Sequence, residues 1–294
     1  QLIQMHYTDP YFLDRDLVGG IDIFGSETNY QDQAQFDSRS RGFGFRFGFP
    51  LSENSRFLMR YQLRKDDVFN VATNASKIIQ AAVGSGTKSI IGYDYYLDER
   101  NDPVDPTAGW DFLLSQDFAG VGGTVRYLSN QLLVHAYHQF AEGYVGTQRL
   151  DVGYIEGIGQ EVRLNDRFFK GGADFRGFKS GGIGPRDITT SDALGAEAYA
   201  FATTEVTFPN GLPDALGVRT SLFSDYGYIG RAYVDPILVG SDQISTTFAP
   251  RVSVGVSVNW KSPFGPVRLD FAKALVSESY DQEQIFSFSA GTSF

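Results

Sequence analysis

Few of the side chains that usually carry chemistry occur in this sequence of 294 residues. It has no cysteine, which excludes a disulfide, a thiolate metal ligand and a thiol nucleophile. Of its three histidines, His135 and His138 are three residues apart, a spacing that places them on opposite faces of a strand rather than around one metal ion. No histidine lies at a convincing spacing from a serine or an aspartate for a protease or a lipase. The sequence therefore predicts neither an enzyme nor a metal site.

Two further stretches bear on ligand binding. Asp98, Glu99, Asp102 and Asp105 offer carboxylates that suit a divalent cation, but such a run is also typical of a solvated turn, which we favour. Residues 181–184 (Gly-Gly-Ile-Gly) lack the Gly-Lys-Ser/Thr ending of a phosphate-binding loop. The net charge of −10 argues against nucleic acid, which needs a basic surface. We therefore expect no cofactor and no nucleic-acid partner.

The elements that position the remaining polar side chains are strands. Apolar and polar residues alternate with a period of two, which places them on opposite faces of a strand. In residues 41–49 four phenylalanines share one face, while glycines and Arg46 share the other, and residues 251–260 repeat the pattern with valines and Trp260. Thirteen strands are predicted, with centres near residues 5, 21, 45, 60, 93, 113, 129, 151, 203, 221, 255, 270 and 290.

Two fold classes produce this alternation. A soluble sandwich buries its apolar face, whereas a transmembrane barrel turns that face to lipid and its polar face inward. The barrel is favoured because the runs of about nine to eleven residues suit a tilted strand that crosses a bilayer. Aromatic residues also gather at strand ends, and tight turns alternate with long polar connections at 66–88, 157–196 and 228–247. We therefore predict an all-β, antiparallel transmembrane β-barrel over residues 1–294.

Some local features are also predicted. The alternation slips at Asn130–Gln131, where we expect a bulge. Residues 75–83 indicate a short surface helix inside a long loop. Bacterial single-chain barrels have an even number of strands because both termini lie on the periplasmic side. The odd count means either that one strand is not recognised or that the chain begins partway through the barrel.

The long loop before the ninth strand carries the motif of a known family. Residues 168–178 (FFKGGADFRGF) and 182–186 (GIGPR) resemble the signature loop of the BamA-type outer-membrane protein assembly factors, the outer-membrane insertase superfamily. Residues 8–12 (TDPYF) resemble an early turn of that family, and residues 262–270 (SPFGPVRLD) resemble its penultimate hairpin. The final Phe294 agrees with the C-terminal aromatic signal of outer-membrane proteins in general.

The resemblance implies a sixteen-stranded barrel preceded by periplasmic repeats. If the turn at residues 8–12 follows the fourth strand of that barrel, thirteen strands remain, which equals the number predicted from the alternation. We therefore expect this chain to lack the first three strands and the periplasmic repeats. A closed, even-stranded barrel within these residues would contradict that expectation. The resemblance also implies that the loop at about 157–196 folds into the barrel.

The lumen loop motif consists of Arg176, Gly177 and Phe178. A guanidinium in a lumen partly closed to water needs acidic partners, and the resemblance implies Glu205 and Asp225, which both lie in the polar phase of their strands. Gly177 allows a sharp turn, and Phe178 is expected to wedge into the lumen. The alternative is that Arg176 is a solvated loop residue.

The function implied by the resemblance is the insertion of other β-barrel proteins into the bacterial outer membrane without nucleotide hydrolysis. Its mechanism is a lateral seam between the first and last strands, whose unpaired edge is costly in lipid and can pair with an incoming strand. The expected last strand, 284–294, carries Phe286, Phe288 and Phe294 as seam strand and signal. Expected partners are unfolded outer-membrane protein clients, the lipid bilayer and accessory outer-membrane lipoproteins that bind the periplasmic repeats.

Three alternatives remain at this point. A polypeptide-secreting or translocating channel of the same superfamily shares the Arg-Gly-Phe loop, and two periplasmic repeats instead of five would distinguish it. A diffusion porin would conduct ions steadily, whereas a barrel plugged by a loop would conduct little and erratically. A soluble β-sandwich that binds a ligand would need no detergent.

Overall fold

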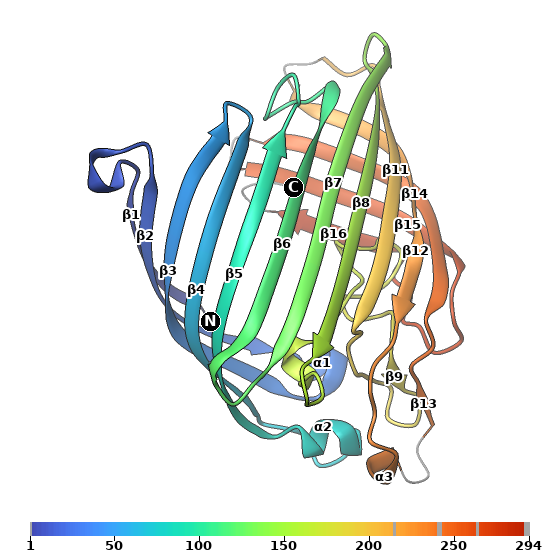
Figure 1. The fold of residues 1–294 in the computed structure, drawn as a ribbon. Coiled ribbons are helices and arrows are strands. Elements are labelled where there is room, and N and C mark those ends of the chain that lie inside the picture. The colour runs from blue at the N-terminus through green and yellow to red at the C-terminus, as the bar shows by residue number, and fades with distance from the viewer. Residues whose placement is uncertain (1, 214–215, 240–242, 263–264, 291–294) are drawn as a thin grey trace.

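One curved, antiparallel sheet dominates the computed structural model, which describes residues 2–213, 216–239, 243–262 and 265–290. Its thirteen strands pair in chain order (Figure 1). They are β1 (Leu2–Asp9), β2 (Val18–Asn29), β3 (Asp37–Ser52), β4 (Ser55–Phe69), β5 (Gly84–Asp98), β6 (Ala108–Gly123), β7 (Tyr127–Ala141), β8 (Tyr144–Gly157), β11 (Ala198–Phe208), β12 (Val218–Gly230), β14 (Ala249–Ser262), β15 (Gly265–Val276) and β16 (Phe286–Ala290). Each predicted strand centre falls inside one of these strands, so the predicted antiparallel all-β fold is confirmed.

The other elements are short and lie in the connections. A second sheet contains β9 (Arg186–Asp187), β10 (Asp192–Ala193) and β13 (Ile244–Ser245). The helices are η1 (Phe12–Asp14), α1 (Gln31–Ala34), α2 (Lys77–Ala81), η2 (Leu164–Asp166) and α3 (Pro236–Val239). The helix expected at 75–83 is present as α2. Within the described part of the chain, no helix is long and apolar enough to cross a membrane.

The two faces of the large sheet differ in polarity. Phe43 and Phe45 on β3 are 41% and 49% exposed on the convex face. The neighbouring polar phase faces the concave side, where Arg46 Nε lies 2.6 Å from Asp22 Oδ2. Figure 1 shows the sheet curling until β14–β16 lie behind β5–β8. This inside-out distribution, with apolar side chains exposed on the outside and charges within, is that of a transmembrane barrel.

The strands extend further than the sequence predicts. The connection predicted at 66–88 shrinks to residues 70–83, because Lys65 and Asp67 still pair in register with β5. The connection predicted at 228–247 begins only after β12 ends at Gly230. Polar residues near the strand ends hide the alternation there, since they are polar on both faces. The long connections gather at one end of the sheet; they are residues 30–36, 70–83, 158–197, 231–248 and 277–285.

The bulge expected at Asn130–Gln131 is not present. Both residues pair in unbroken register with β6 and with β8, and the shift on this strand lies between Gln139 and Ala141. Asn130 Oδ1 accepts a hydrogen bond from Gln116 Nε2 at 2.5 Å, across the strand pair. The slip in the alternation therefore reflects a polar cross-strand contact and not an extra residue in the backbone.

Candidate functional site

The longest connection, residues 158–197, provides the candidate site. It leaves the sheet at the end of β8, returns at the start of β11, and contains η2, β9 and β10. Phe175 and Phe178 are 0% and 1% exposed, and Arg176 between them is 6% exposed. A loop that were merely solvated would not bury an arginine and two phenylalanines. The segment around Arg176 therefore packs against the concave face of the sheet.

Arg176 is held by two carboxylates on neighbouring strands. Its Nη2 and Nε donate to the two oxygens of Asp225 at 2.6 and 2.8 Å, and its Nη1 donates to Glu205 Oε2 at 2.7 Å. The backbone N–H of Arg176 also donates to Asp225, at 3.0 Å. This is the bidentate geometry that a planar guanidinium favours. The structure thus brings together the three residues that the sequence analysis proposed as partners.

Strand register explains why these two acids converge. Asp225 on β12 pairs with Thr203 on β11, and Glu205 lies two residues along β11 in the same inward phase. Thr203 Oγ1 donates to Asp225 at 2.8 Å, which fixes the rotamer of the carboxylate. β12 continues beyond Asp225 to Gly230. Asp225 is therefore held by regular pairing on both sides and not by a flexible strand end.

The guanidinium of Arg176 also lies on an aromatic ring. Its Cζ is 3.3 Å from the centroid of Phe223, which faces inward between Glu205 and Asp225. Phe223 can lie flat there because its neighbour on β14 is Gly255, where a Cβ would come within 2.5 Å of the ring. A desolvated cation over an aromatic ring gains about 2 kcal/mol. Gly255 therefore supports the site because the absence of a side chain there leaves room for the ring of Phe223.

Sequence reasoning missed two members of this charge network, Arg268 and Asp270 on β15. Arg268 Nη2 donates to Glu205 Oε2 at 3.0 Å, and its Nε donates to Asp270 Oδ1 at 2.9 Å. Asp270 Oδ1 also lies 3.9 Å from Arg176 Nη1. These residues are two apart in the inward phase of a strand, which is the same signal that marks Glu205 and Asp225. The network therefore contains two cations and three carboxylates.

Burial and the neighbouring charges shift the pKa of Arg176 in opposite directions. Burial lowers the pKa of the guanidinium, while the hydrogen bonds and charge of Asp225 and the charge of Glu205 raise it. The net effect is a pKa above the ordinary value of arginine. Arg176 is therefore a permanent cation, and its acceptors hold it in place without any proton transfer. The arrangement can clamp a loop to a barrel wall.

Gly177 has the backbone conformation that the motif requires. Its φ is +92°, in the region that favours glycine. A Cβ at this position would lie 3.0 Å from the Cβ of Ser253 on β14 and 3.6 Å from that of Ala272 on β15. Small side chains on the wall and a glycine on the loop thus allow the close approach of the two backbones.

Phe178 lies in a buried apolar cluster between the loop and the wall. The cluster also includes Phe175, Ile183, Tyr199 and Phe201. The rings of Phe175 and Phe178 meet edge to face, with centroids 5.7 Å apart. The wedge position expected for Phe178 is therefore where the structure places this side chain.

The same loop is tied to the segment that leads into the last strand. Lys179 N donates to Gln282 O at 2.9 Å, Gln282 N donates to Gly182 O at 2.9 Å, and Gln284 N donates to Gly177 O at 3.0 Å. Residues 282–284 directly precede β16. The position of the loop and the entry of the final strand are thus coupled through backbone hydrogen bonds.

A second buried charge cluster fixes the start of the loop. Lys88 on β5 is fully buried and contacts both Asp66 on β4 and Asp166 in η2. Arg64 lies 3.2 Å from Asp66 and 3.7 Å from Asp166. Sequence reasoning missed this cluster because its members come from three separate segments, and only the fold brings them together.

The groups considered for metal binding are engaged elsewhere. His135 Nδ1 lies 3.0 Å from Asp111 Oδ2, while His138 is exposed on the opposite phase of β7. Asp102 accepts hydrogen bonds from the N–H groups of Val104 and Asp105, which lower its pKa. Among the residues that the structure describes, no group of three or more histidines and acids could hold a metal ion.

The predicted seam residues are only partly described. Phe286 and Phe288 lie on β16 and are 46% and 61% exposed. Phe294 lies outside the described residues, as do Pro263 and Phe264 of the penultimate hairpin.

Comparisons with known proteins identify relatives of this chain. An outer membrane protein assembly factor BamA from Neorickettsia risticii (strain Illinois) is 29% identical over 286 residues, covering 97% of this chain and 38% of that protein. A protein of the same name from Nitratidesulfovibrio vulgaris is 30% identical over 297 residues, covering 98% of this chain and 36% of that protein. The chain thus spans well under half the length of these curated relatives. Both are outer-membrane proteins of bacteria, and this chain shares that location.

A solved structure shares the fold. The crystal structure of BamA from Haemophilus ducreyi lacking POTRA domains 1–3 superimposes with a TM-score of 0.85 at 21% identity, covering 98% of this chain and 61% of that one. The Omp85 superfamily domain matches residues 1–294, the whole of the sequence. The chain therefore belongs to the Omp85 superfamily, and it forms a part of the outer-membrane barrel of that family.

Proposed function

We propose that this chain is the barrel of an outer-membrane β-barrel insertase, which folds other barrel proteins and inserts them into the membrane. The observation that carries the proposal is the 29–30% identity, over 97–98% of the chain, to two assembly factors. No step in this function needs a nucleotide or a covalent intermediate, because the free energy comes from the client's own burial and hydrogen bonding in lipid. The clients are unfolded outer-membrane proteins, and accessory lipoproteins bind the periplasmic part of the protein.

The lumen loop stabilises the wall next to the proposed seam. Arg176 binds to β11 and β12, while Arg268 and Asp270 extend the network to β15. Ser287 on β16 donates to Asp270 at 3.4 Å, which links the last described strand weakly to the same charges. The docked loop thus ties β11, β12 and β15 together, and β16 reaches this network through Ser287.

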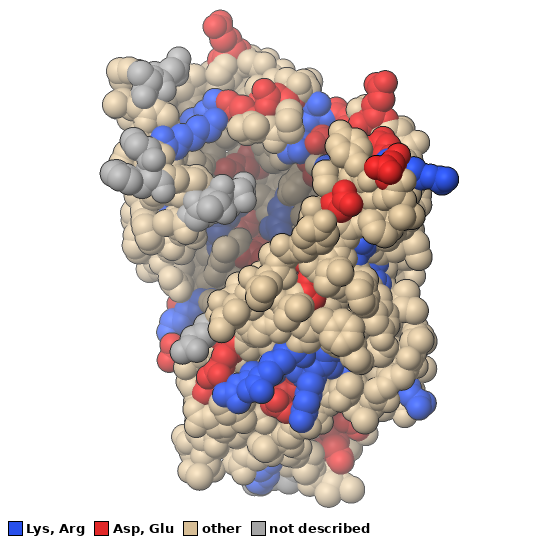
Figure 2. Space-filling model, turned by 90° about the vertical axis from the view of Figure 1, so that its left-hand side faces the viewer, with Lys and Arg blue, Asp and Glu red and all other residues tan. Residues whose placement is uncertain are grey.

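The seam of the proposed mechanism lies along β16. Among the described residues, β16 pairs with β15 at Phe286–Ala290. In the proposed mechanism its other edge faces the first strand of the barrel and separates from it. A free edge offers N–H and C=O groups to an incoming strand, which joins by β-augmentation. Figure 2 shows a hollow on this side of the molecule, with charged side chains visible inside it.

Site-specific photo-crosslinking tests the proposal in the full-length protein. A photoreactive residue at Phe288 should capture a client barrel during its insertion, while the same residue at Tyr226, exposed in the middle of the sheet, should capture little. A third position, His135, faces the lumen. Capture at the lumen position and not at Phe288 would identify a polypeptide-secreting channel of the same superfamily. Equal capture at Phe288 and Tyr226 would contradict the seam.

Ion conductance separates the remaining alternative. A barrel whose lumen holds the packed segment around Phe175 and Phe178 should pass current only in brief, irregular events. A steady open-pore current from the full-length protein in a planar bilayer would instead identify a diffusion porin.

A further inference from the structure

One row of side chains on the convex face of the sheet carries positive charges that no acidic residue of the row balances. In register across four strands stand Ile3 on β1, Gly25 on β2, Arg41 on β3 and Lys65 on β4. Arg41 and Lys65 are exposed neighbours, about 5 Å apart at the backbone, and like charges in this arrangement repel. Within the described residues neither has an ion-pair partner. The pair therefore leaves two positive charges available to a ligand.

The next row toward the long connections shows that this imbalance is local. There Arg39 stands between Glu27 and Asp67 in the strand register, and its Nη2 lies 2.8 Å from Glu27 Oε2. Its guanidinium also lies over the ring of Phe69, 4.6 Å from the centroid. Arg39 is thus satisfied by the protein itself, whereas Arg41 is not.

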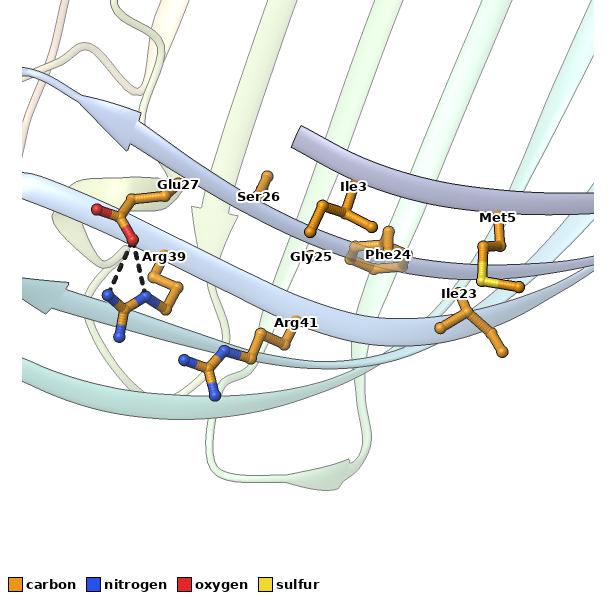
Figure 3. Close-up of a pocket in the computed structure, with 9 residues that line it drawn as sticks. All are labelled: Ile3, Met5, Ile23, Phe24, Gly25, Ser26, Glu27, Arg39 and Arg41. Atoms are coloured by element: carbon orange, nitrogen blue, oxygen red, sulfur yellow. Dashed lines mark hydrogen bonds and ion pairs between the residues drawn. The ribbon is translucent and has the colours of Figure 1, made fainter. Parts of the chain in front are cut away.

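An apolar hollow opens beside Arg41. It has a volume of about 330 Å³, and its lining includes Ile3, Met5 and Ile23. The ion pair of Arg39 and Glu27 lines its end toward the long connections. In Figure 3 the side chains of these three residues and of Arg41 point to the same side of the sheet. The floor is Gly25, where a Cβ would meet nothing within 4 Å. The hollow therefore exists because one residue of the row has no side chain.

The depth of the row matches the membrane surface. The next row toward the short turns is apolar, with Met5, Ile23, Phe43 and Leu63 in register. Two residues along a strand correspond to about 7 Å. Arg41 and Lys65 thus lie one step beyond side chains that face hydrocarbon, at the level where the headgroups of anionic lipids attract basic residues.

We propose that this surface binds one lipid with a phosphate-bearing headgroup. The phosphate bridges the guanidinium of Arg41 and the ammonium of Lys65, since arginine binds phosphate with a planar fork and lysine as a point charge. An acyl chain lies in the hollow over Gly25, against Ile3 and Ile23. Bound phosphate also removes the repulsion between the two cations.

Native mass spectrometry of the full-length protein in detergent tests the site, with phosphatidic acid as the probe and phosphatidylcholine as the uncharged comparison. The variant with both Arg41→Gln and Lys65→Gln should bind phosphatidic acid roughly twenty-five-fold more weakly, at about fivefold for each basic side chain. Phosphatidylcholine binding should not change. The matched control is Lys273→Gln, an exposed lysine in the outward phase of β15 whose partner on β14 is Val254. It should change the affinity less than twofold.

A second variant tests the hollow separately from the charges. Gly25→Leu fills the space without strain, since its backbone is extended and nothing lies near its Cβ position. It should weaken the binding of phosphatidic acid about tenfold, although both cations remain. Heat-modifiable mobility on a gel shows that each variant is folded. The proposal would be overturned if Lys273→Gln lost as much affinity for phosphatidic acid, or if phosphatidylcholine bound as tightly as phosphatidic acid. Full displacement of the lipid by inorganic phosphate at equal concentration would also overturn it.

Discussion

Replacing Arg176 with alanine should destabilise the barrel at least as much as any other single change in the lumen network. Asp225 is 2% exposed, and among the described residues its side-chain oxygens accept only from Arg176 and Thr203. Removing one partner of a buried ion pair costs about 3–5 kcal/mol, because the other charge stays buried and unpaired. We expect Arg176→Ala to lower the free energy of unfolding by about that amount.

Alanine variants of the two acids that bind Arg176 should destabilise the barrel to different extents. Asp225→Ala should match Arg176→Ala, since it leaves the guanidinium buried with Glu205 as its nearest acid. Glu205→Ala should cost less, about 1.5–3 kcal/mol, because Arg176 keeps both bonds to Asp225. Heat-modifiable mobility of the full-length protein on gels, measured over a range of temperatures, gives the midpoint for each variant.

The control variant changes an exposed ion pair. Arg219 contacts both oxygens of Asp105 but is about half exposed, so Arg219→Ala should cost about 0–1 kcal/mol. Combining Arg176→Ala with Asp225→Ala should cost less than the sum of the single changes, with a coupling of about 0.5–3 kcal/mol. An Arg176→Ala midpoint equal to that of Arg219→Ala, or strict additivity in the double variant, would show that Arg176 and Asp225 do not stabilise the barrel as a buried pair.

Two other buried features give predictions of the same kind. Gly177→Val should release the loop from the wall, because the new side chain meets Ser253 and the φ of +92° is strained for valine. Limited proteolysis should then cut the loop, and an unchanged digestion pattern would count against the close approach. Lys88→Met should cost about 3–5 kcal/mol by leaving Asp66 and Asp166 with a single cation. Restoring stability by also changing Asp166→Asn would support this, and a wild-type melting midpoint for Lys88→Met alone would disprove it.

The sheet could be predicted because apolar and polar residues alternate along its strands. Each outward Phe43 and Phe45 alternates with an inward glycine or Arg46, so strand existence and facing follow from a period of two. The limits of the strands could not be predicted in the same way. Lys65 and Asp67 are polar on the outer face as well, and only the pairing with β5 shows that they are strand residues.

Only part of the candidate site could be predicted from the sequence. Arg176, Glu205 and Asp225 could be proposed because charges in inward phases are few and the loop motif resembles a known one. Arg268 and Asp270 carry that inward-phase signal as well, although no local feature links them to Arg176.

Features that depend on distant segments could not be foreseen. Phe223 lies under the guanidinium only because Gly255 stands beside it on the next strand. The sheet of β9, β10 and β13 has strands of two residues, too short for any period to be seen.

Reconstitution in liposomes measures the proposed insertase activity itself. Liposomes that contain the full-length protein receive an unfolded outer-membrane barrel as client, with no nucleotide added, and heat-modifiable mobility measures how fast the client folds. We expect the client to fold faster than in empty liposomes, and more slowly with Arg176→Ala once that variant's own fold has been verified. Equal folding rates in liposomes with and without the protein would contradict the proposed function.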